Sequence, residues 1–386
     1  MRKKIFLSAP HMSGGEENYV KEAFDTNWIA PLGNNVNEFE SEIKSYTGIG
    51  SACALSSGTA GIHIALDLLE VGHNDIVFCS SLTFIASANP ILYLGAKPVF
   101  IDSDLESWNM SPLALEKAFK AYEEKGQLPK AVVIVNLYGQ SARMDELMAV
   151  CDKYGVVVVE DAAESLGSKY KGKMSGTFGK FGIFSFNGNK IITTSGGGMI
   201  VSEDEELIKK ALKKATQSRD QAVHYQHSEV GYNYRLSNIS AGIGRGQMEV
   251  LDERVSQKRA IFDRYVEGLD HIEGIEFMPE LEDTLHNRWL STLTIDSKNL
   301  NVTVNDIVEH LAKFNIEARP VWKPMHMQPL FEDCEYYSEE NDNARYLFEN
   351  GICLPSDTKM TEEEQDFVIY KIKELIKKNS SASASK

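Results

Sequence analysis

The stretch Val156-Val157-Val158-Val159-Glu160-Asp161 decides the fold class, because four consecutive apolar residues lead directly into two carboxylates. A continuous apolar run of this length is typical of a strand that helices cover on both faces. Residues 131–136 contain a second such run, Val132-Val133-Ile134-Val135. Both runs therefore predict central strands of a parallel sheet.

Short apolar runs alternate with helical stretches from about residue 50 to residue 215. We predict strands at residues 52–56, 76–80, 98–102, 131–136, 156–161, 182–186 and 199–202. We predict helices among them at residues 60–69, 112–124, 144–154 and 204–215. This order predicts an α/β fold with a mostly parallel sheet and right-handed crossovers. Ligands bind such sheets beyond the carboxyl ends of the strands.

The chain has 386 residues, which is enough for a large domain and a smaller one. We predict a large domain over residues 1–250, a smaller α+β domain over 251–378 and a disordered tail over 379–386. A long helix at residues 241–267 would link the two domains. The small domain would contain strands at 290–295 and 318–321 and helices at 304–314 and 361–378.

Charge and composition argue against several classes of function. The net charge of −16 disfavours nucleic-acid and membrane-surface binding, since both partners are anionic. No apolar stretch approaches the roughly 20 residues of a membrane span, and the N-terminus lacks the apolar core of a signal peptide. The five cysteines contain no C-x-x-C pair, so neither a disulfide framework nor a metal site is indicated. We expect a cytoplasmic protein.

Two common phosphate-binding motifs are missing. No G-x-G-x-x-G follows the first predicted strand. Residues 167–173 read G-x-x-x-x-G-K, but Met174 occupies the Ser/Thr position and no helix is predicted directly after it. We interpret this match as chance, which disfavours nicotinamide-dependent enzymes and P-loop proteins.

Two residues at predicted strand ends suggest a cofactor site. Asp161 ends one strand, and Lys190 follows another and precedes the small, polar run Thr193-Thr194-Ser195-Gly196-Gly197-Gly198. Taken singly, the aspartate could be a helix cap or a metal ligand and the lysine a solvated surface charge. Together, they match the requirements of pyridoxal phosphate (PLP). The lysine forms a Schiff base, and the acid keeps the pyridine nitrogen protonated.

A phosphate site is predicted at residues 54–60, Ala-Leu-Ser-Ser-Gly-Thr-Ala. This sequence combines a strand end, a turn of small residues and a helix start around Gly58 and Thr59. Free N–H groups and the helix dipole attract anions at such a position. An ordinary capped helix is the alternative interpretation.

Several motifs follow one another along the chain. They are Ser57-Gly58-Thr59-Ala60, Glu160-Asp161-Ala162-Ala163, Phe184-Ser185-Phe186 with Lys190, and Gly231-Tyr232-Asn233-Tyr234-Arg235-Leu236. In this order they resemble the DegT/StrS family of PLP-dependent nucleotide-sugar aminotransferases. The resemblance spans residues 5–376 and includes Trp28-Ile29-Ala30-Pro31 and Cys353-Leu354-Pro355-Ser356.

The resemblance implies a fold of the aspartate-aminotransferase type (PLP fold type I) and a homodimer with active sites at the subunit interface. Lys190 would hold the cofactor, which alternates between PLP and pyridoxamine phosphate (PMP), and Asp161 would pair with its pyridinium. The implied cofactor-binding residues are Gly58, Thr59, Phe84, Asp161, Glu164, Ser185, Lys190 and Asn233 of the partner subunit. Phe84 would stack on the ring, unless it is a core aromatic. Glu164 stands where relatives often carry Gln or His near the ring hydroxyl.

Weaker candidates for contact with the sugar nucleotide lie in loops. They are Trp28, Ala30, His227, Tyr232, Arg235, Arg319 and His326. A histidine in a polar loop is more often solvated than functional, and a structural role is the alternative for Arg235.

The resemblance implies transfer of an amino group from L-glutamate to a nucleotide-linked keto-sugar. The nearest branch aminates C4 of a UDP-linked 4-keto-6-deoxy-N-acetylhexosamine (the bacillosamine type), which gives a UDP-4-amino sugar and 2-oxoglutarate. The residues themselves do not distinguish C3 from C4, or UDP from TDP or GDP. Asn187-Gly188-Asn189 replaces the more common His-Pro type of run and suggests a substrate subgroup.

Two alternatives share the fold. A PMP-dependent sugar dehydratase would carry histidine at the lysine position, so Lys190 counts against it. A non-catalytic regulator would be expected to have lost Asp161 or Lys190, and this chain retains both.

Overall fold

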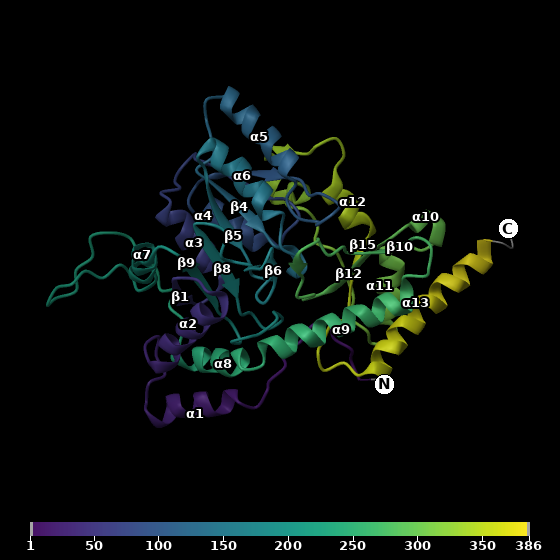
Figure 1. The fold of residues 1–386 in the computed structure, drawn as a ribbon, viewed down its shortest axis with the longest axis horizontal. Coiled ribbons are helices and arrows are strands. Elements are labelled where there is room, and N and C mark those ends of the chain that lie inside the picture. Colours follow the sequence, from purple (N-terminus) through teal and green to yellow (C-terminus); the bar gives the residue numbers. More distant parts are fainter. Residues whose placement is uncertain (1–2, 384–386) are drawn as a thin grey trace.

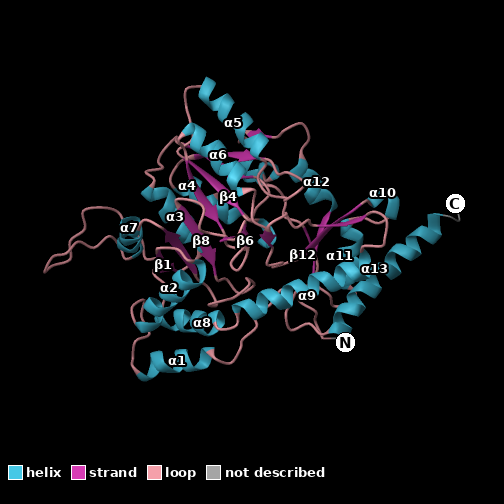
Figure 2. Ribbon diagram, in the orientation of Figure 1, coloured by secondary structure: helices cyan, strands magenta, loops and turns pink. Residues whose placement is uncertain are grey.

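The computed structural model describes residues 3–383, which form a large mixed sheet, a small antiparallel sheet and the helices around them (Figures 1 and 2). The strands of the large sheet are, in spatial order, β1 (Ser51–Leu55), β9 (Gly198–Ser202), β8 (Phe181–Ser185), β5 (Val157–Asp161), β4 (Ala131–Val135), β2 (Ile76–Ser80), β3 (Lys97–Ile101) and β14 (Tyr336–Tyr337). Within the described part of this sheet, β9 runs antiparallel to both of its neighbours, β1 and β8, and the other strand pairs are parallel. The predicted fold class is therefore confirmed, and each of the seven strands predicted from residue 52 to 202 is present within one residue of its expected bounds.

Helices cover both faces of the large sheet, as the continuous apolar runs predict. The helices that follow the pattern of alternation are α3 (Gly58–Leu68), α5 (Pro112–Glu124), α6 (Met144–Tyr154) and α7 (Glu205–Ala215). Val132 and Ile134 of β4 belong to an apolar cluster that includes side chains of α5 and α6. Val133 points to the other face and belongs to a cluster with side chains of α3 and α7. Alternate residues of one strand thus anchor two separate cores.

The remaining elements surround these cores. The small antiparallel sheet consists of β10 (Ile275–Phe277), β12 (Ser291–Ile295), β15 (Gly351–Leu354) and β13 (Arg319–Pro320), and a third sheet of β11 (Thr284–Leu285), β6 (Lys169–Tyr170) and β7 (Lys173–Met174). The other helices are α1 (Glu16–Asp25), α2 (Asn34–Thr47), α4 (Asn89–Tyr93), α8 (Asn238–Met248), α9 (Leu251–Leu269), α10 (Ser297–Leu300), α11 (Val304–Ala312), α12 (Asn343–Asn350) and α13 (Glu362–Ser383). Short 3₁₀ turns are η1 (Ile85–Ser87), η2 (Leu137–Gly139), η3 (Met325–Met327) and η4 (Pro329–Phe331). Among residues 3–383, no helix is long and apolar enough to cross a bilayer.

The long helix predicted over residues 241–267 is two helices, α8 and α9, which are separated at Glu249 and Val250. α9 extends from α8 toward the small sheet and α13 (Figure 1). α13 continues to Ser383, past the start of the predicted tail at residue 379, and residues 384–386 lie outside the described part. The division of the chain at residue 250 remains a prediction.

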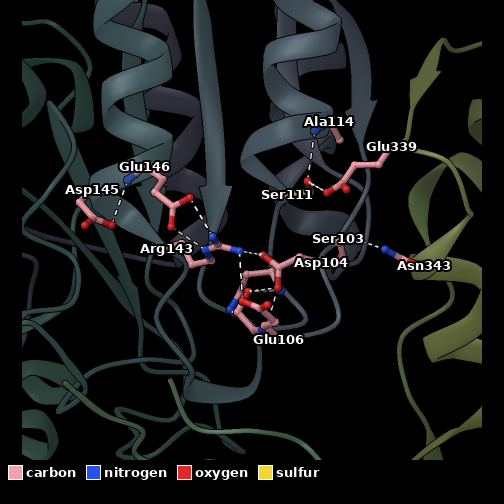
Figure 3. A network of polar contacts seen from close by, with 12 residues as sticks. Ser103, Asp104, Glu106, Ser111, Ala114, Arg143, Asp145, Glu146, Glu339 and Asn343 are labelled. Carbon is pink, nitrogen blue, oxygen red and sulfur yellow. Dashed lines mark hydrogen bonds and ion pairs between the residues drawn. The ribbon is translucent and has the colours of Figure 1, made fainter. Parts of the chain in front are cut away.

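Segments from the two ends of the chain cross this predicted division. Ile5 forms a parallel bridge with Ile316, so the N-terminal segment lies against the C-terminal part. In the other direction, β14 joins the edge of the large sheet beside β3. At the start of α12, Asn343 Nδ2 donates a hydrogen bond to Ser103 O over 2.9 Å (Figure 3). The two parts of the chain are therefore joined by these contacts as well as by α9, which connects them along the sequence.

Candidate active site

A cavity of about 340 Å³ lies beyond the carboxyl ends of β4, β5 and β8, within the size range of small-molecule sites. Seven residues predicted to bind a cofactor line it: Gly58, Thr59, Phe84, Asp161, Glu164, Ser185 and Lys190. The parallel strands bring these distant segments to one edge of the sheet, as expected for the fold.

Asp161 is the last residue of β5 and is only 5% exposed. Its Oδ2 atom accepts a hydrogen bond of 2.6 Å from the Ser87 hydroxyl, and its Oδ1 atom accepts one of 3.1 Å from Ala163 N. Burial raises the pKa of Asp161, while these hydrogen bonds and the positive charge of Lys190 oppose the rise. A cationic group in the cavity would stabilise the carboxylate.

Lys190 follows the end of β8 and points its amine into the cavity. Nζ lies 3.3 Å from Glu164 Oε1 and 4.3 Å from the centre of the Trp289 ring. The amine is therefore held between a carboxyl group and an aromatic face.

Glu164 is the second buried carboxyl group in the cavity. Its Oε2 atom accepts a hydrogen bond of 2.7 Å from the backbone N–H of Tyr138, a residue in the left-handed region with φ of 54°. Burial raises the pKa of Glu164, and Lys190 opposes this effect. The cavity thus contains two buried carboxyl groups, Asp161 and Glu164, and one lysine. A second cation, such as a protonated ring nitrogen, could therefore pair with one of these carboxyl groups.

The N-terminus of α3 forms a cradle for an anion at another side of the cavity. The Ser57 hydroxyl caps the helix by accepting a hydrogen bond of 3.0 Å from Ala60 N. The first N–H groups of a helix have no partner inside the helix, and the dipole makes this end positive. A Cβ atom at Gly58 would lie only 3.2 Å from Cβ of Ser185, so a side chain there would crowd the cradle. The cavity therefore fits the phosphate, ring nitrogen and aldehyde of PLP.

Aromatic side chains form the walls. Phe84 is half-exposed, and its ring centre lies 5.2 Å from that of Trp322. Trp289 and Trp322 line the cavity and were missed by the sequence analysis. Each adjoins a predicted strand of the small domain, at 290–295 and 318–321, but the sequence does not place those strand ends beside Lys190.

Three predicted residues lie in the segment between α7 and α8, which projects from the rest of the chain (Figure 1). His227 is exposed, with Nδ1 2.8 Å from Gln217 O. Tyr232 OH donates to Asp67 Oδ2 over 3.2 Å. Asn233 is also exposed. Within this chain, none of the three lines the cavity.

Trp28 and Ala30 lie in the loop between α1 and α2, also outside the cavity. Asn238 binds this loop, since its Nδ2 donates to Trp28 O over 2.6 Å and its backbone N to Ala30 O over 2.9 Å. The Trp28 side chain is 52% exposed. The loop is therefore held firmly while its tryptophan faces outward.

Arg235 and His326 have partners elsewhere in the fold. Arg235 pairs with Glu40 and donates to Ala54 O over 3.0 Å. His326 Nδ1 lies 2.7 Å from the Ser81 hydroxyl, and Nε2 lies 3.2 Å from Asp342 Oδ2. These contacts fit structural roles better than contact with a substrate.

Comparison with known proteins agrees with this geometry. Residues 10–373 match the DegT/DnrJ/EryC1/StrS aminotransferase family. The chain belongs to this family. It is 61% identical over 371 residues to the Bacillus subtilis protein named "Putative pyridoxal phosphate-dependent aminotransferase EpsN", which covers 96% of this chain and 95% of that protein. It is 37% identical over 376 residues to the GDP-perosamine synthase of Escherichia coli O157:H7, which covers 97% and 99%.

Among solved structures, it resembles Streptococcus pneumoniae "Putative sugar aminotransferase Spr1654" in its PMP form. The TM-score is 0.90 at 26% identity, over 99% of this chain and 100% of that one. The PLP form of that protein gives a TM-score of 0.89. The chain is thus a PLP-dependent sugar aminotransferase, and the predictions of enzyme class and cofactor are confirmed.

Proposed function

We propose that this enzyme transfers an amino group from L-glutamate to C4 of UDP-2-acetamido-2,6-dideoxy-4-keto-hexose, with Lys190 and Asp161 as its catalytic residues. The observation that carries the proposal is the meeting of the Lys190 amine, the Asp161 carboxyl group and the α3 N-terminus in one cavity. These three features provide a nucleophilic amine, a partner for a ring nitrogen and an anion site.

Each feature has a distinct task in holding the cofactor. Bound PLP supplies an aldehyde that exchanges amines and a protonated ring that withdraws electrons from a substrate carbon. Asp161 keeps the proton on the ring nitrogen, and Gly58, Thr59 and Ser185 bind the phosphate. Phe84 covers one face of the ring from its position at the cavity mouth. Glu164 would orient the ring hydroxyl of the cofactor by a hydrogen bond.

Lys190 first holds the cofactor through Nζ and, once an incoming amine releases it, carries a proton. With the cofactor bound, Nζ would act as the base that removes the proton from the α-carbon of the amino donor, and the resulting ammonium would supply the proton when the keto-sugar receives its amine. Glu164, at 3.3 Å, would hold the released amine in place by a hydrogen bond. Trp289, whose ring centre lies 4.3 Å from this amine, would limit the access of water to it.

The identity of the sugar acceptor rests on resemblance. The resemblance to the bacillosamine type favours a UDP-linked sugar and amination at C4. A GDP-linked keto-sugar is the second candidate, because a GDP-perosamine synthase is 37% identical over nearly the whole chain.

We further propose that two copies of this chain share their active sites. The exposed Trp28, His227 and Asn233 lie outside this chain's own cavity, on a firmly bound loop and on the projecting segment. In a homodimer these segments would complete the cavity of the other copy, with Asn233 of the partner subunit at the phosphate and Ala30 and Tyr232 near the sugar.

Absorbance and product analysis test the proposal. Purified protein with PLP should develop a visible band that L-glutamate bleaches, with release of 2-oxoglutarate. The PMP-loaded protein is then offered UDP-, GDP- and TDP-linked 4-keto sugars, and the position of the new amine is read by NMR. Fastest return of the visible band with the UDP sugar, and an amine at C4, is expected. Failure to bleach with glutamate would refute the amino-donor assignment, and preference for another nucleotide would refute the acceptor assignment.

A further inference from the structure

The backbone carbonyl of Asn189, the residue before Lys190, is clamped by two donors from distant parts of the chain. The indole N–H of Trp289 donates to it over 2.6 Å, and the Ser8 hydroxyl donates to it over 3.1 Å. The Trp289 ring also faces Lys190 Nζ. Thus the peptide that carries the cofactor lysine is held from the side of the small sheet and from the N-terminal segment.

Lys258 supports this clamp from within the protein. It belongs to α9 and is only 3% exposed. Its Nζ atom donates to the Ser8 hydroxyl over 3.1 Å and to Ser356 O over 2.5 Å. Ser356 N in turn donates to Leu7 O over 2.7 Å. The Ser8 hydroxyl therefore accepts from Lys258 and donates to Asn189, a chain of bonds in which each strengthens the next.

Burying a lysine is costly, and its environment offers little charge compensation. Burial lowers the pKa of Lys258 to about 7, and Asp357 only partly opposes this effect. A methionine would fill similar space without that cost. The lysine must therefore contribute something other than packing.

We propose that Lys258 is a positioning residue, which holds Ser8 against the Asn189 carbonyl and so keeps the Lys190 amine between Glu164 and Trp289. The inference rests on the proposed role of Lys190 in holding the cofactor. Lys258 acts through Ser8 and touches neither cofactor nor substrate.

The test is a pH titration of the visible absorbance of PLP-loaded protein, for wild type, Ser8→Ala, Lys258→Met and the double variant. When the clamp is lost, Lys190 drifts from the Glu164 carboxylate and the Trp289 ring, which stabilise the protonated linkage. The titration midpoint should then fall by about 0.5 of a pH unit. The double variant should shift no further than Lys258→Met, because both changes break one chain of bonds.

Lys359→Met is the matched control. Lys359 Nζ donates to Pro10 O over 2.7 Å, so it binds the same N-terminal segment without reaching Asn189. Its midpoint should equal that of wild type. If Lys258→Met does not fold, Ser8→Ala decides the question, since it removes only a hydroxyl.

The outcomes are separable. Unchanged midpoints in folded Ser8→Ala and Lys258→Met would refute the clamp, and shifts that add in the double variant would refute the route through Ser8. An equal shift in Lys359→Met would show a general loosening of the N-terminal segment and would also overturn the proposal. A wild-type protein that gains no visible band with PLP would overturn the proposed function instead, and the clamp with it.

Discussion

Lys190 owes its properties to the residues that surround its amine. Glu164 Oε1 lies 3.3 Å from the Lys190 Nζ atom, and the centre of the Trp289 ring lies 4.3 Å from it. Asp161 adds a second buried carboxyl group to the same cavity. Glu164 and Trp289 thus hold the lysine in place, and Asp161 offers a partner for the positive ring nitrogen of a cofactor that also carries an anionic phosphate.

Replacement of Lys190 by alanine should lower turnover by about 10³-fold or more, since both the nucleophile and the proton carrier are lost. Borohydride reduction of PLP-loaded wild type should attach the cofactor to the Lys190 peptide, as read by mass spectrometry. Lys190→Arg keeps the positive charge but not the nucleophile, so it should behave like alanine in both assays. Full turnover in either variant would contradict the assignment of Lys190.

At the scale of elements, the important arrangement is a helix N-terminus beside a strand end. The first turn of α3 meets the end of β8, where a Cβ atom at Gly58 would lie only 3.2 Å from Cβ of Ser185. The cap at Ser57 fixes the first turn of the helix, and Gly58 and Thr59 of that turn line the cavity. We therefore expect this cap to serve both stability and cofactor binding.

Ser57→Ala should lower the free energy of unfolding by about 1 kcal/mol and weaken PLP binding several-fold. Ser111→Ala is the control, because Ser111 caps α5 by accepting from Ala114 N over 3.1 Å, away from the cavity (Figure 3). It should cost a similar free energy and leave the dissociation constant of PLP unchanged. Denaturant unfolding and fluorescence titration measure the two effects. Equal weakening of PLP binding in both variants would argue against a phosphate at α3.

At the scale of the whole molecule, Lys258 joins α9, the N-terminal segment and the chain after β15. Its pKa in the folded protein is about 7, against 10.5 for an ordinary lysine. Between these values the unfolded chain binds a proton that the folded chain does not. This residue therefore makes the free energy of unfolding rise with pH from about 7 to 10.5, by up to about 1.4 kcal/mol per pH unit. Below pH 7 the folded chain carries the buried charge, and the destabilisation is complete.

Lys258→Met should lack this contribution. Denaturant unfolding at several pH values between 7 and 9 should show a shallower rise in stability for the variant than for wild type. Lys359→Met, which removes an exposed lysine, provides the comparison. Parallel curves for wild type and Lys258→Met would show that Lys258 titrates normally.

Shared active sites predict that two inactive variants can rescue each other. A dimer with one Lys190→Ala chain and one Asn233→Ala chain contains one intact cavity, provided that Asn233 serves the partner's site. Random exchange of subunits should then restore about a quarter of wild-type activity. Mixing followed by mild dissociation and reassociation tests this. No recovery, although mass analysis shows mixed dimers, would place Asn233 in its own chain's function.

The sequence by itself determined the strands and helices of the large sheet and most of the cofactor-binding residues that line the cavity. Strand and helix positions follow from short-range apolar periodicity, and residues at strand ends such as Asp161 and Lys190 must gather at one edge of a parallel sheet. Seven predicted cofactor residues therefore line one cavity. The family motifs strengthened this prediction, because they lie at those same strand ends.

Only the tertiary structure decided which distant segments complete the site. Trp289 and Trp322 come from the C-terminal part of the chain, and Ser8 lies 181 residues from Asn189, so no local pattern connects them with Lys190. Arg235 belongs to a motif, yet it pairs with Glu40 because the fold brings α2 beside it. Local periodicity depends on neighbours along the chain, whereas these contacts depend on the path of the whole chain, which no single segment specifies.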